Sequence, residues 1–279
     1  MSAAPEPVRR IPVGLSSSSV YPGGIEATFQ AARDLGYDGV EVMVLADPLS
    51  RDGDGLCELS ERYELPIFAI HAPTLLLTQN VWGSDPWDKV DRAAELAHHV
   101  GAETVVIHPP FIWQRRYAEN FVGAIAERER LDGMRLAVEN MFPWRAKTGR
   151  WRERSIQAYA PGWDPLEHDY GSVTLDLSHS ATAGYSPEET LAMVDQLGDR
   201  LAHLHLCDGS PNFKDEHWPP GQGNQPCDEV LRRLAERGFG GSVVVELNTR
   251  GRSSVARRTA LADSLAFARE HLGQSVLER

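Results

Sequence analysis

Eight short segments rich in β-branched and apolar residues recur along the chain, and longer helical patterns separate them. These segments span residues 11–15, 39–44, 66–71, 104–108, 135–139, 173–176, 201–206 and 242–247. Strands that alternate with helices form βαβ units, in which successive strands run parallel within one sheet. The alternation therefore predicts an α/β protein built around a parallel sheet.

A parallel sheet of this kind either closes into a (β/α)8 TIM barrel or stays open as a doubly wound sheet. Eight units in 279 residues fit the barrel, which typically takes about 250 residues. The open sheet usually carries a GxGxxG phosphate-binding loop after its first strand, whereas this loop reads Ser16-Ser17-Ser18-Ser19. No linker separates the chain into halves. We therefore expect a single TIM-barrel domain over residues 11–279, preceded by a flexible N-terminal arm over residues 1–10.

The composition narrows the class of protein. With 42% hydrophobic and 24% charged residues, the chain has the composition of a globular protein rather than a disordered one. Its net charge of −12 argues against general nucleic-acid binding, because proteins of that kind present basic surfaces. Three cysteines without CxxC spacing, no secretory leader and no apolar run of about 20 residues predict a cytoplasmic protein without a membrane partner. No sequence feature predicts an oligomeric state.

Ionisable side chains follow most of the predicted strands, at or just beyond the point where each strand ends. Nine of them are His71, His108, Glu139, Asp176, His179, His205, Asp215, His217 and Glu246. In a TIM barrel all the strands run the same way, so their C-terminal ends meet at one rim. We therefore expect these nine side chains to converge on one pocket.

A single histidine or carboxylate at a strand end is more often a hydrogen-bonded residue than a metal ligand. The joint pattern is different, because packing so many ionisable groups together without a cation costs desolvation and like-charge repulsion. Imidazole and carboxylate together suit zinc, manganese or iron. The nine residues thus predict a metal site. His203 lies deeper on the same strand as His205 and is expected to be a buried, hydrogen-bonded histidine instead.

Short motifs around these residues resemble the xylose-isomerase-like barrel superfamily, which includes endonuclease IV and many sugar isomerases and epimerases. The resemblance covers the whole chain. Its motifs are His71-Ala72-Pro73, His108-Pro109, Val138-Glu139-Asn140, Asp176-Leu177-Ser178-His179, His205-Leu206-Cys207-Asp208, Asp215-Glu216-His217 and Val245-Glu246.

The resemblance implies divalent metal ions, with zinc the most expected and manganese or magnesium as alternatives. In the endonuclease IV branch, nine residues hold three zinc ions, and all nine positions look matched here, with Glu139 as the bridging ligand. The epimerase branch generally keeps one metal ion, at positions that match Glu139, Asp176, His205 and Glu246. The resemblance alone therefore allows up to three ions.

Two features separate the chain from endonuclease IV. Its first strand reads Gly14-Leu15-Ser16-Ser17 where that enzyme has a His-Val-Ser type sequence. Its second strand carries the Gly39-Val40-Glu41 sequence that is common among the sugar isomerases, and no DNA-inserting loops are recognisable. The resemblance therefore favours the sugar isomerase branch by a small margin.

Two loops next to the predicted rim are basic and rich in aromatic residues. Residues 113–117 and 144–154 together carry a net charge of +6, which leaves about −18 for the rest of the chain. The predicted substrate-binding residues in these loops are Trp113, Arg115, Arg116, Arg145 and Lys147. A basic edge around a metal-binding mouth suits a small phosphorylated substrate. The alternative is that these are solvated surface loops without a role.

Three functions are compatible with these features. The first is a metal-dependent isomerase or epimerase that acts on a phosphorylated sugar or polyol, with Glu139 and Glu246 moving the proton. The second is an endonuclease IV-like zinc phosphoesterase that cleaves abasic-site DNA or a small phosphodiester. The third, a barrel kept only for binding, fits poorly with a complete ligand set. The first is preferred, so a nucleic-acid partner is possible but not favoured.

Overall fold

The computed structural model describes residues 10–74, 78, 80–148, 152–212 and 214–274. The predicted N-terminal arm lies outside these residues except for Arg10, so it stays a prediction. The side chains of residues 145–155 are also outside the description. The predicted substrate-binding residues Arg145 and Lys147 are among them.

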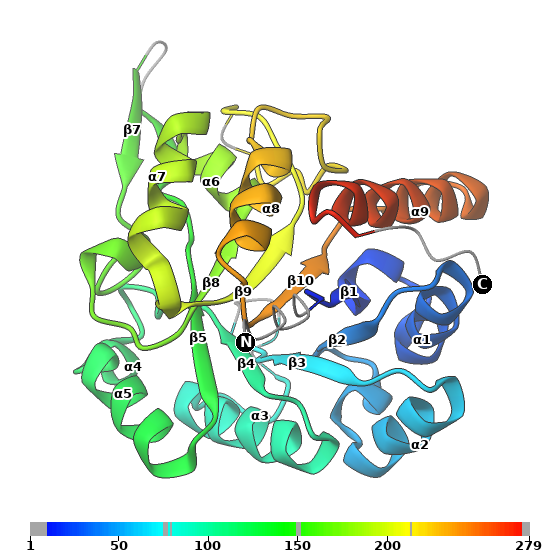
Figure 1. Cartoon of the computed structure of the whole chain (residues 1–279). Coiled ribbons are helices and arrows are strands. Elements are labelled where there is room, and N and C mark those ends of the chain that lie inside the picture. Colours follow the sequence, from blue (N-terminus) through cyan, green and yellow to red (C-terminus); the bar gives the residue numbers. More distant parts are fainter. Residues whose placement is uncertain (1–9, 75–77, 79, 149–151, 213, 275–279) are drawn as a thin grey trace, which may run out of the picture.

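Eight parallel strands close into a barrel, which confirms the predicted α/β fold with a single TIM barrel (Figure 1). The barrel strands are β1 (Val13–Ser16), β2 (Gly39–Met43), β3 (Ile67–His71), β4 (Thr104–Ile107), β5 (Arg135–Glu139), β8 (Val173–Asp176), β9 (Leu201–Leu206) and β10 (Ser242–Val245). Neighbours follow the order β1-β10-β9-β8-β5-β4-β3-β2, and β1 pairs with β2 to complete the ring. Each predicted strand overlaps one of these eight.

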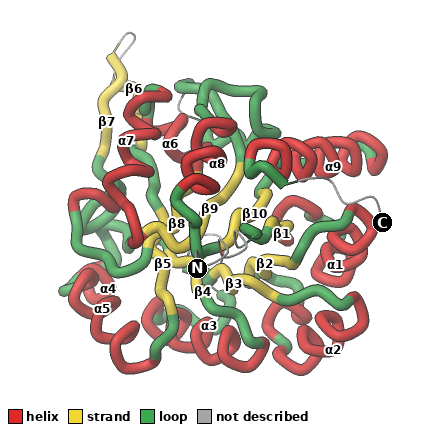
Figure 2. The backbone as a smooth tube through the Cα atoms, viewed as in Figure 1, coloured by secondary structure: helices red, strands yellow, loops and turns green. Residues whose placement is uncertain are grey.

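Helices surround the ring of strands on the outside (Figure 2). They are α1 (Gly24–Leu35), α2 (Gly53–Tyr63), α3 (Pro86–Val100), α4 (Arg115–Ala118), α5 (Phe121–Asp132), α6 (Leu177–Ala183), α7 (Pro187–Leu197), α8 (Cys227–Glu236) and α9 (Ser254–His271). Short 3-10 helices are η1 (Ser17–Val20), η2 (Pro48–Arg51), η4 (Pro165–Glu167) and η5 (Gly198–Arg200). Within the described residues, no helix combines the length and the apolar character that crossing a bilayer requires.

Local sequence signals set the helix ends. The Asp85 side chain accepts a hydrogen bond from the Trp87 amide at the start of α3, and Gly101 ends that helix with a φ of 73°. At α7, Ser186 and Glu189 form a reciprocal capping box. Such caps pair the amides and carbonyls that a helix leaves free at its ends.

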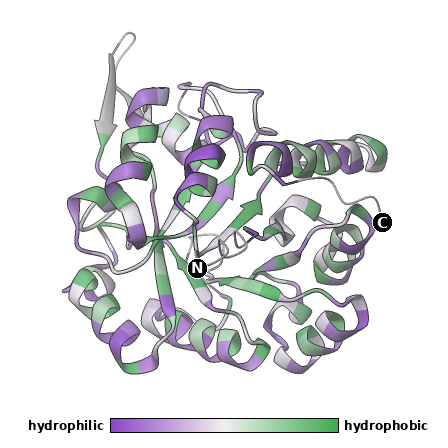
Figure 3. Ribbon diagram, viewed as in Figure 1, coloured by the Kyte–Doolittle hydropathy of each residue, from purple (hydrophilic) through white to green (hydrophobic). Residues whose placement is uncertain are grey.

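The core lies between the barrel strands and the inner faces of the helices. Figure 3 shows β3 and β10 as largely hydrophobic, whereas the helices carry hydrophobic and hydrophilic residues together. Phe29 of α1, Leu56 of α2 and Ile125 of α5 are completely buried in this layer. Apolar burial of this kind is the main driving force for holding the helices on the barrel.

One element was not predicted. Residues expected to form a loop after the fifth barrel strand contain an antiparallel hairpin of β6 (Trp144–Thr148) and β7 (Arg152–Ile156). The hairpin projects away from the body of the barrel, beside α7 in the view of Figure 1. In its register, Trp144 pairs with Ile156 at the base and Thr148 pairs with Arg152 near the tip.

Candidate metal centre

The parallel strands bring all nine predicted ligand residues to one end of the barrel, which we call the mouth. His71, Glu139 and Asp176 are the last residues of β3, β5 and β8. His108 and Glu246 directly follow β4 and β10. The remaining members are His205 within β9, His179 in α6, and Asp215 and His217 in the loop after β9. Seven of the nine are buried, while His217 is half-buried and Asp215 is exposed.

The first group of potential ligands is His71, His108 and Glu139. Glu139 Oε2 lies 2.8 Å from His108 Nε2 and 3.4 Å from His71 Nε2. One ligand atom from each of the three residues falls within 4.8 Å of the others. Two imidazole nitrogens and a carboxylate oxygen therefore face a common point.

The second group is centred on His205. Its Nδ1 lies 2.9 Å from Glu246 Oε2, 3.0 Å from Glu139 Oε1 and 3.4 Å from Asp176 Oδ2. Ser18 donates a hydrogen bond of 2.9 Å to the other oxygen of Glu246. Because Glu139 uses one oxygen in each group, it joins the two groups, and its bridging of two metal ions stays a prediction.

The third group lies on the open side of the mouth. His217 Nε2 lies 3.2 Å from Asp176 Oδ2, and its Nδ1 lies 2.8 Å from Asp215 Oδ1. His179 Nε2 lies 3.5 Å from Asp215 Oδ2, and its Nδ1 lies 2.9 Å from the Asn140 carbonyl oxygen. Donation to that carbonyl leaves Nε2 of His179 directed at the group.

Two side chains hold the loop that carries Asp215 and His217. The Ser178 hydroxyl donates to Asp215 Oδ1 at 3.1 Å and accepts from the His217 amide at 3.0 Å. Further along, the buried Asp208 carboxylate accepts hydrogen bonds from the amides of Gly221, Gly223 and Gln225. These contacts tie an irregular segment to the barrel, so its two polar side chains reach the mouth in a fixed geometry.

The chemistry of the mouth fits a divalent cation. Among the described residues, Glu139 Oε2 and His108 Nδ1 are buried without a hydrogen-bond partner, although Oε2 is close to two imidazole nitrogens. A buried oxygen without a directed hydrogen bond needs an explanation, and a cation held between this oxygen and the two imidazole nitrogens supplies one. Mixed nitrogen and oxygen ligands suit zinc, and manganese is also compatible.

The pKa values of the mouth residues also fit a cation site. Burial alone would raise the pKa of Glu139, but the charges of His108, His205 and His179 hold it well below its usual range. Burial alone would lower the pKa of His179, but Asp176, Asp215 and Glu139 raise it to about 10. Imidazolium groups such as that of His179 are therefore paired with carboxylates, whereas burial lowers the pKa of His108, and a bound metal ion would take the place of the protons.

Sequence reasoning did not select Glu41 as a functional residue. It is completely buried on β2, and its Oε2 lies 2.9 Å from His203 Nε2 and 3.1 Å from His205 Nε2. A single acidic residue inside the apolar run Val40-Glu41-Val42 was the available signal. His203 is buried and hydrogen-bonded, as predicted; its Nδ1 lies 3.0 Å from Ser242 Oγ.

A cavity of about 300 Å³ opens onto the mouth. On one side it is lined by candidate ligand residues such as His71, Glu139 and Glu246. Its remaining wall is apolar and aromatic, and consists of Met43, Phe111, Met141, Phe142, Trp144 and Tyr159. No lysine or arginine lines this cavity within the part of the chain that the structure describes.

Three of the five predicted substrate-binding residues have described side chains, and they differ in how they relate to the cavity. Trp113 stacks on Phe111 of the cavity wall, with ring centroids 4.7 Å apart, and keeps 49% of its surface exposed. Arg115 and Arg116 begin α4 and are exposed to solvent. The structure thus connects Trp113 to the cavity through an aromatic contact, whereas the two arginines stand outside its lining.

Comparison with known proteins agrees with this architecture. Residues 29–271 match the family described as xylose isomerase-like TIM barrel. An uncharacterized protein of Mycobacterium tuberculosis is 49% identical in an alignment 277 residues long; the match covers 94% of this chain and 98% of that protein. Fructoselysine 3-epimerase of Escherichia coli O157:H7 is 27% identical in an alignment 245 residues long; the match covers 81% of this chain and 86% of the enzyme.

Solved structures show the same fold at lower identity. Endonuclease IV from Thermus thermophilus superposes with a TM-score of 0.60 at 23% identity, covering 93% of this chain and 99% of that one. The IOLI protein, whose crystal structure contains a zinc atom, superposes with a TM-score of 0.65 at 15% identity, covering 94% and 98%. From the family match over most of its length, the chain belongs to the xylose isomerase-like TIM barrel family.

Proposed function

We propose that this protein is a divalent-metal-dependent epimerase or isomerase that moves a proton at a carbon next to a carbonyl or hydroxyl group of a sugar or polyol. The observation that carries the proposal is the group of Glu139, Asp176, His205 and Glu246. Their ligand atoms lie within 4.8 Å of one another, and two members line the cavity. The fructoselysine 3-epimerase relative supports an epimerase in particular.

These four residues would hold the metal ion, with zinc expected first and manganese or magnesium as alternatives. A bound divalent ion supplies positive charge that stabilises developing negative charge on a substrate oxygen. Glu139 and Glu246 reach His205 Nδ1 from two different strands, at 3.0 Å and 2.9 Å. Carboxylates placed in this way are suited to remove a proton from one face of a carbon and to return one to the other face.

The cavity wall suits a sugar. Phe111, Trp144 and Tyr159 present aromatic surface next to the polar mouth, and such surface packs against the carbon-bound hydrogens of a sugar ring or chain. A substrate would then have its oxygens at the mouth and its carbon skeleton along the aromatic wall.

We further propose that the substrate carries a phosphate group. The support is the basic composition of residues 113–117 and 144–154, which border the cavity through Trp113 and Trp144. Since the described cavity lining contains no lysine or arginine, the phosphate would be bound at the outer edge of the site. A comparison of kcat/KM for a ketose and its phosphate ester tests this separately from the reaction type.

A second candidate function is phosphoester hydrolysis of the endonuclease IV type. The observation in its favour is the third group, in which His179, Asp215 and His217 approach Asp176. A reaction at one metal ion does not need these residues, whereas clustered ions are typical of phosphodiester cleavage.

Three measurements on the purified protein distinguish the two candidates. The first is the metal content per chain, and the second is solvent deuterium incorporation into fructoselysine, free ketoses and ketose phosphates. The third is cleavage of a duplex that contains an abasic site. Exchange with a ketose supports the proposal. Cleavage of the duplex with no exchange on any ketose would overturn it in favour of the hydrolase.

Variants test whether the mouth residues carry out the exchange reaction. Glu246→Gln should abolish exchange, because it removes one of the two proton-transferring carboxylates. Glu103→Gln is the matched control, since that glutamate is exposed at the opposite end of the barrel. Equal exchange rates in both variants would contradict the assignment of Glu246.

A further inference from the structure

Buried polar groups continue from the mouth down into the barrel interior. They run from His205 on β9 through Glu41 on β2 and His203 on β9 to Ser242 at the start of β10. Glu41, His203 and His205 have no solvent exposure, and Ser242 has 8%. Closed barrels normally fill this space with apolar side chains, so a line of four polar residues calls for a specific role.

The hydrogen bonds fix which nitrogen donates at each histidine. His205 Nε2 lies 3.1 Å and His203 Nε2 lies 2.9 Å from the same oxygen, Oε2 of Glu41. A carboxylate accepts hydrogen bonds, so both imidazole rings donate from Nε2. On the other side of His203, Nδ1 accepts from the Ser242 hydroxyl at 3.0 Å.

This pattern commits the Nε2 of His205 to Glu41 and leaves Nδ1 for the mouth. Nδ1 is the nitrogen that faces Glu246, Glu139 and Asp176. A histidine that binds a metal commonly donates its other ring N–H to a carboxylate, which sets the tautomer and the orientation of the ring.

We propose that Glu41, itself held by His203 and Ser242, is a positioning residue that fixes His205 with Nδ1 directed at the metal ion. The inference rests on the proposed function in that His205 is taken as a metal ligand. Glu41 contacts neither the substrate cavity nor the other ligands of the second group, so its role is exerted through His205.

The cost of burying Glu41 supports a functional reason for it. Its Oε1 is buried without a hydrogen-bond partner among the described residues. An apolar side chain of similar volume at such a position is often neutral or stabilising. Stability alone therefore does not explain a carboxylate here, whereas orientation of His205 does.

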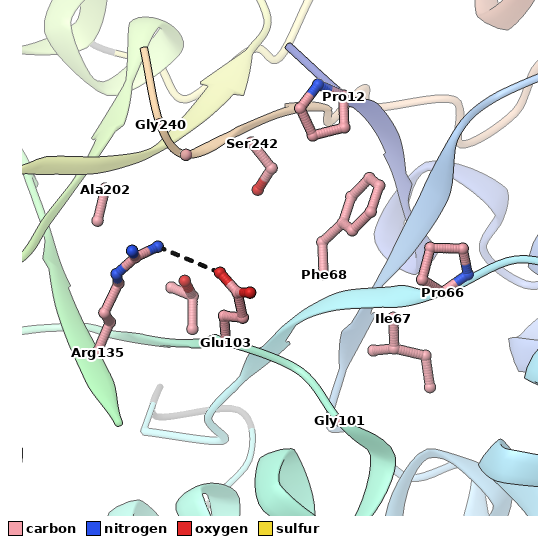
Figure 4. A pocket seen from close by; sticks show the side chains of 12 residues that line it. Pro12, Pro66, Ile67, Phe68, Gly101, Glu103, Arg135, Ala202, Gly240 and Ser242 are labelled. Carbon is pink, nitrogen blue, oxygen red and sulfur yellow. Dashed lines mark ion pairs between the residues drawn. The ribbon is translucent and has the colours of Figure 1, made fainter. Parts of the chain in front are cut away.

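Ser242 is the member of the series that lies farthest from the mouth. Figure 4 shows its side chain at the edge of a cavity of about 210 Å³ at the opposite end of the barrel, which Phe68, Glu103 and Arg135 also line. Ser242→Ala therefore removes the last hydrogen bond of the series without placing a change at the mouth.

The test compares three variants in zinc binding, measured by competition with a chromophoric chelator. Glu41→Gln should weaken zinc binding by about 10- to 100-fold, the range typical for loss of such a carboxylate. Ser242→Ala should weaken it by less than about tenfold, because Glu41 keeps its contact with His205. Thr174→Val is the matched control; it removes a buried hydroxyl of β8 that has no partner among the described residues, and it should bind zinc as the wild type does.

A second measurement reads the tautomer directly. Long-range ¹H–¹⁵N NMR correlations of His205 in the zinc-loaded wild type should show a protonated Nε2 and a metal-bound Nδ1. Zinc bound through Nε2 would overturn the proposal even if Glu41→Gln failed to fold. Unchanged zinc affinity in Glu41→Gln would overturn it as well. If the wild-type protein bound no zinc, manganese or magnesium, that result would contradict the proposed function itself, and this inference would fail with it.

Discussion

The two ends of the barrel both gather charged residues, but in opposite surroundings. At the mouth, Glu139 and His108 are 2.8 Å apart with side chains 2% and 4% exposed. At the opposite end, which we call the floor, Arg135 and Glu103 are 3.5 Å apart with side chains 46% and 75% exposed (Figure 4). Water screens the floor pair and leaves it little energetic weight, whereas the mouth groups depend on one another for their charge.

Around Phe68, the floor is held by close packing instead. Phe68 fits against two glycines of neighbouring strands, where a Cβ at Gly39 would lie 2.5 Å and one at Gly14 would lie 2.8 Å from its ring. The same barrel thus has an aromatic side chain packed against glycines at one end and a buried cluster of candidate metal ligands at the other. Burial, rather than the number of charges, is what separates a site with chemistry from an ordinary ion pair.

The largest expected effect comes from Glu139→Gln. The change leaves His108, His205 and His179 without their shared carboxylate, so the metal-free protein should lose about 3–5 kcal/mol of stability. It should also lose the stabilisation that zinc gives the wild type, which is about 2.7 kcal/mol at a zinc concentration 100 times Kd. Urea unfolding with and without zinc measures both. A variant that zinc stabilises as strongly as the wild type would contradict the central place of Glu139.

The pH dependence of the metal-free protein should follow the mouth. The pKa of His179 is about 10 in the folded protein, because nearby carboxylates overcome the opposing effect of burial, against 6.5 ordinarily. A raised pKa gives stability that is complete below about pH 6.5 and is lost as the pH rises through 10. Unfolding free energy should therefore fall by a few kcal/mol between pH 6.5 and 10. Zinc should flatten this decline, and a flat profile in the metal-free protein would refute the expectation.

A smaller effect is expected for Asp215→Asn at the exposed side of the mouth. Asparagine keeps an oxygen for the Ser178 hydroxyl but removes the charge beside His179 and His217. The variant should retain the ion of the Glu139–Glu246 group and lower the zinc content by about one ion per chain if the third group binds zinc. Elemental analysis measures this, and deuterium exchange on a ketose shows whether the lost ion serves the reaction.

The smallest effect is expected at the floor. Glu103→Gln removes an exposed ion pair with Arg135 and should change the unfolding free energy by less than about 0.5 kcal/mol, with unaltered zinc binding. Thermal unfolding and chelator competition test this. A loss comparable to that of Glu139→Gln would show that the two ends do not differ in the way their burial indicates.

The convergence of the nine candidate ligands at one end of the barrel was predictable because the topology determines it. Once eight strands are parallel, residues such as His71 and Glu139 must meet at one end, whatever the details of the helices. Ser242 and Glu41 could not be given a role in this way, because a single polar residue in an apolar strand marks an unusual position without showing what it contacts. Their partner His203 could be placed only as buried and hydrogen-bonded.

The structure of the segments beside the cavity was harder to predict from the sequence. Within the segment 144–156, only residues 144–147 alternate apolar and polar side chains, and residues 152–155 are all polar, so the pattern does not predict a pair of strands. The sequence after the fourth strand predicts one helix near residues 116–130, but Asn120, whose φ is 51°, separates the segment into α4 and α5. The division leaves Arg115 and Arg116 on a short exposed helix instead of the cavity wall.

The closure of the barrel has a consequence for self-association. Every barrel strand has a neighbour on both sides, so the ring offers no free edge to which another chain could add a strand. Among the described residues, the two-stranded β6–β7 sheet is where edges remain open. Its strands contain Arg145, Lys147, Arg152 and Arg154 in sequence, and lysine and arginine on an edge oppose pairing with a like-charged copy. Protection against aggregation thus comes from geometry in the barrel and from electrostatic repulsion in the hairpin.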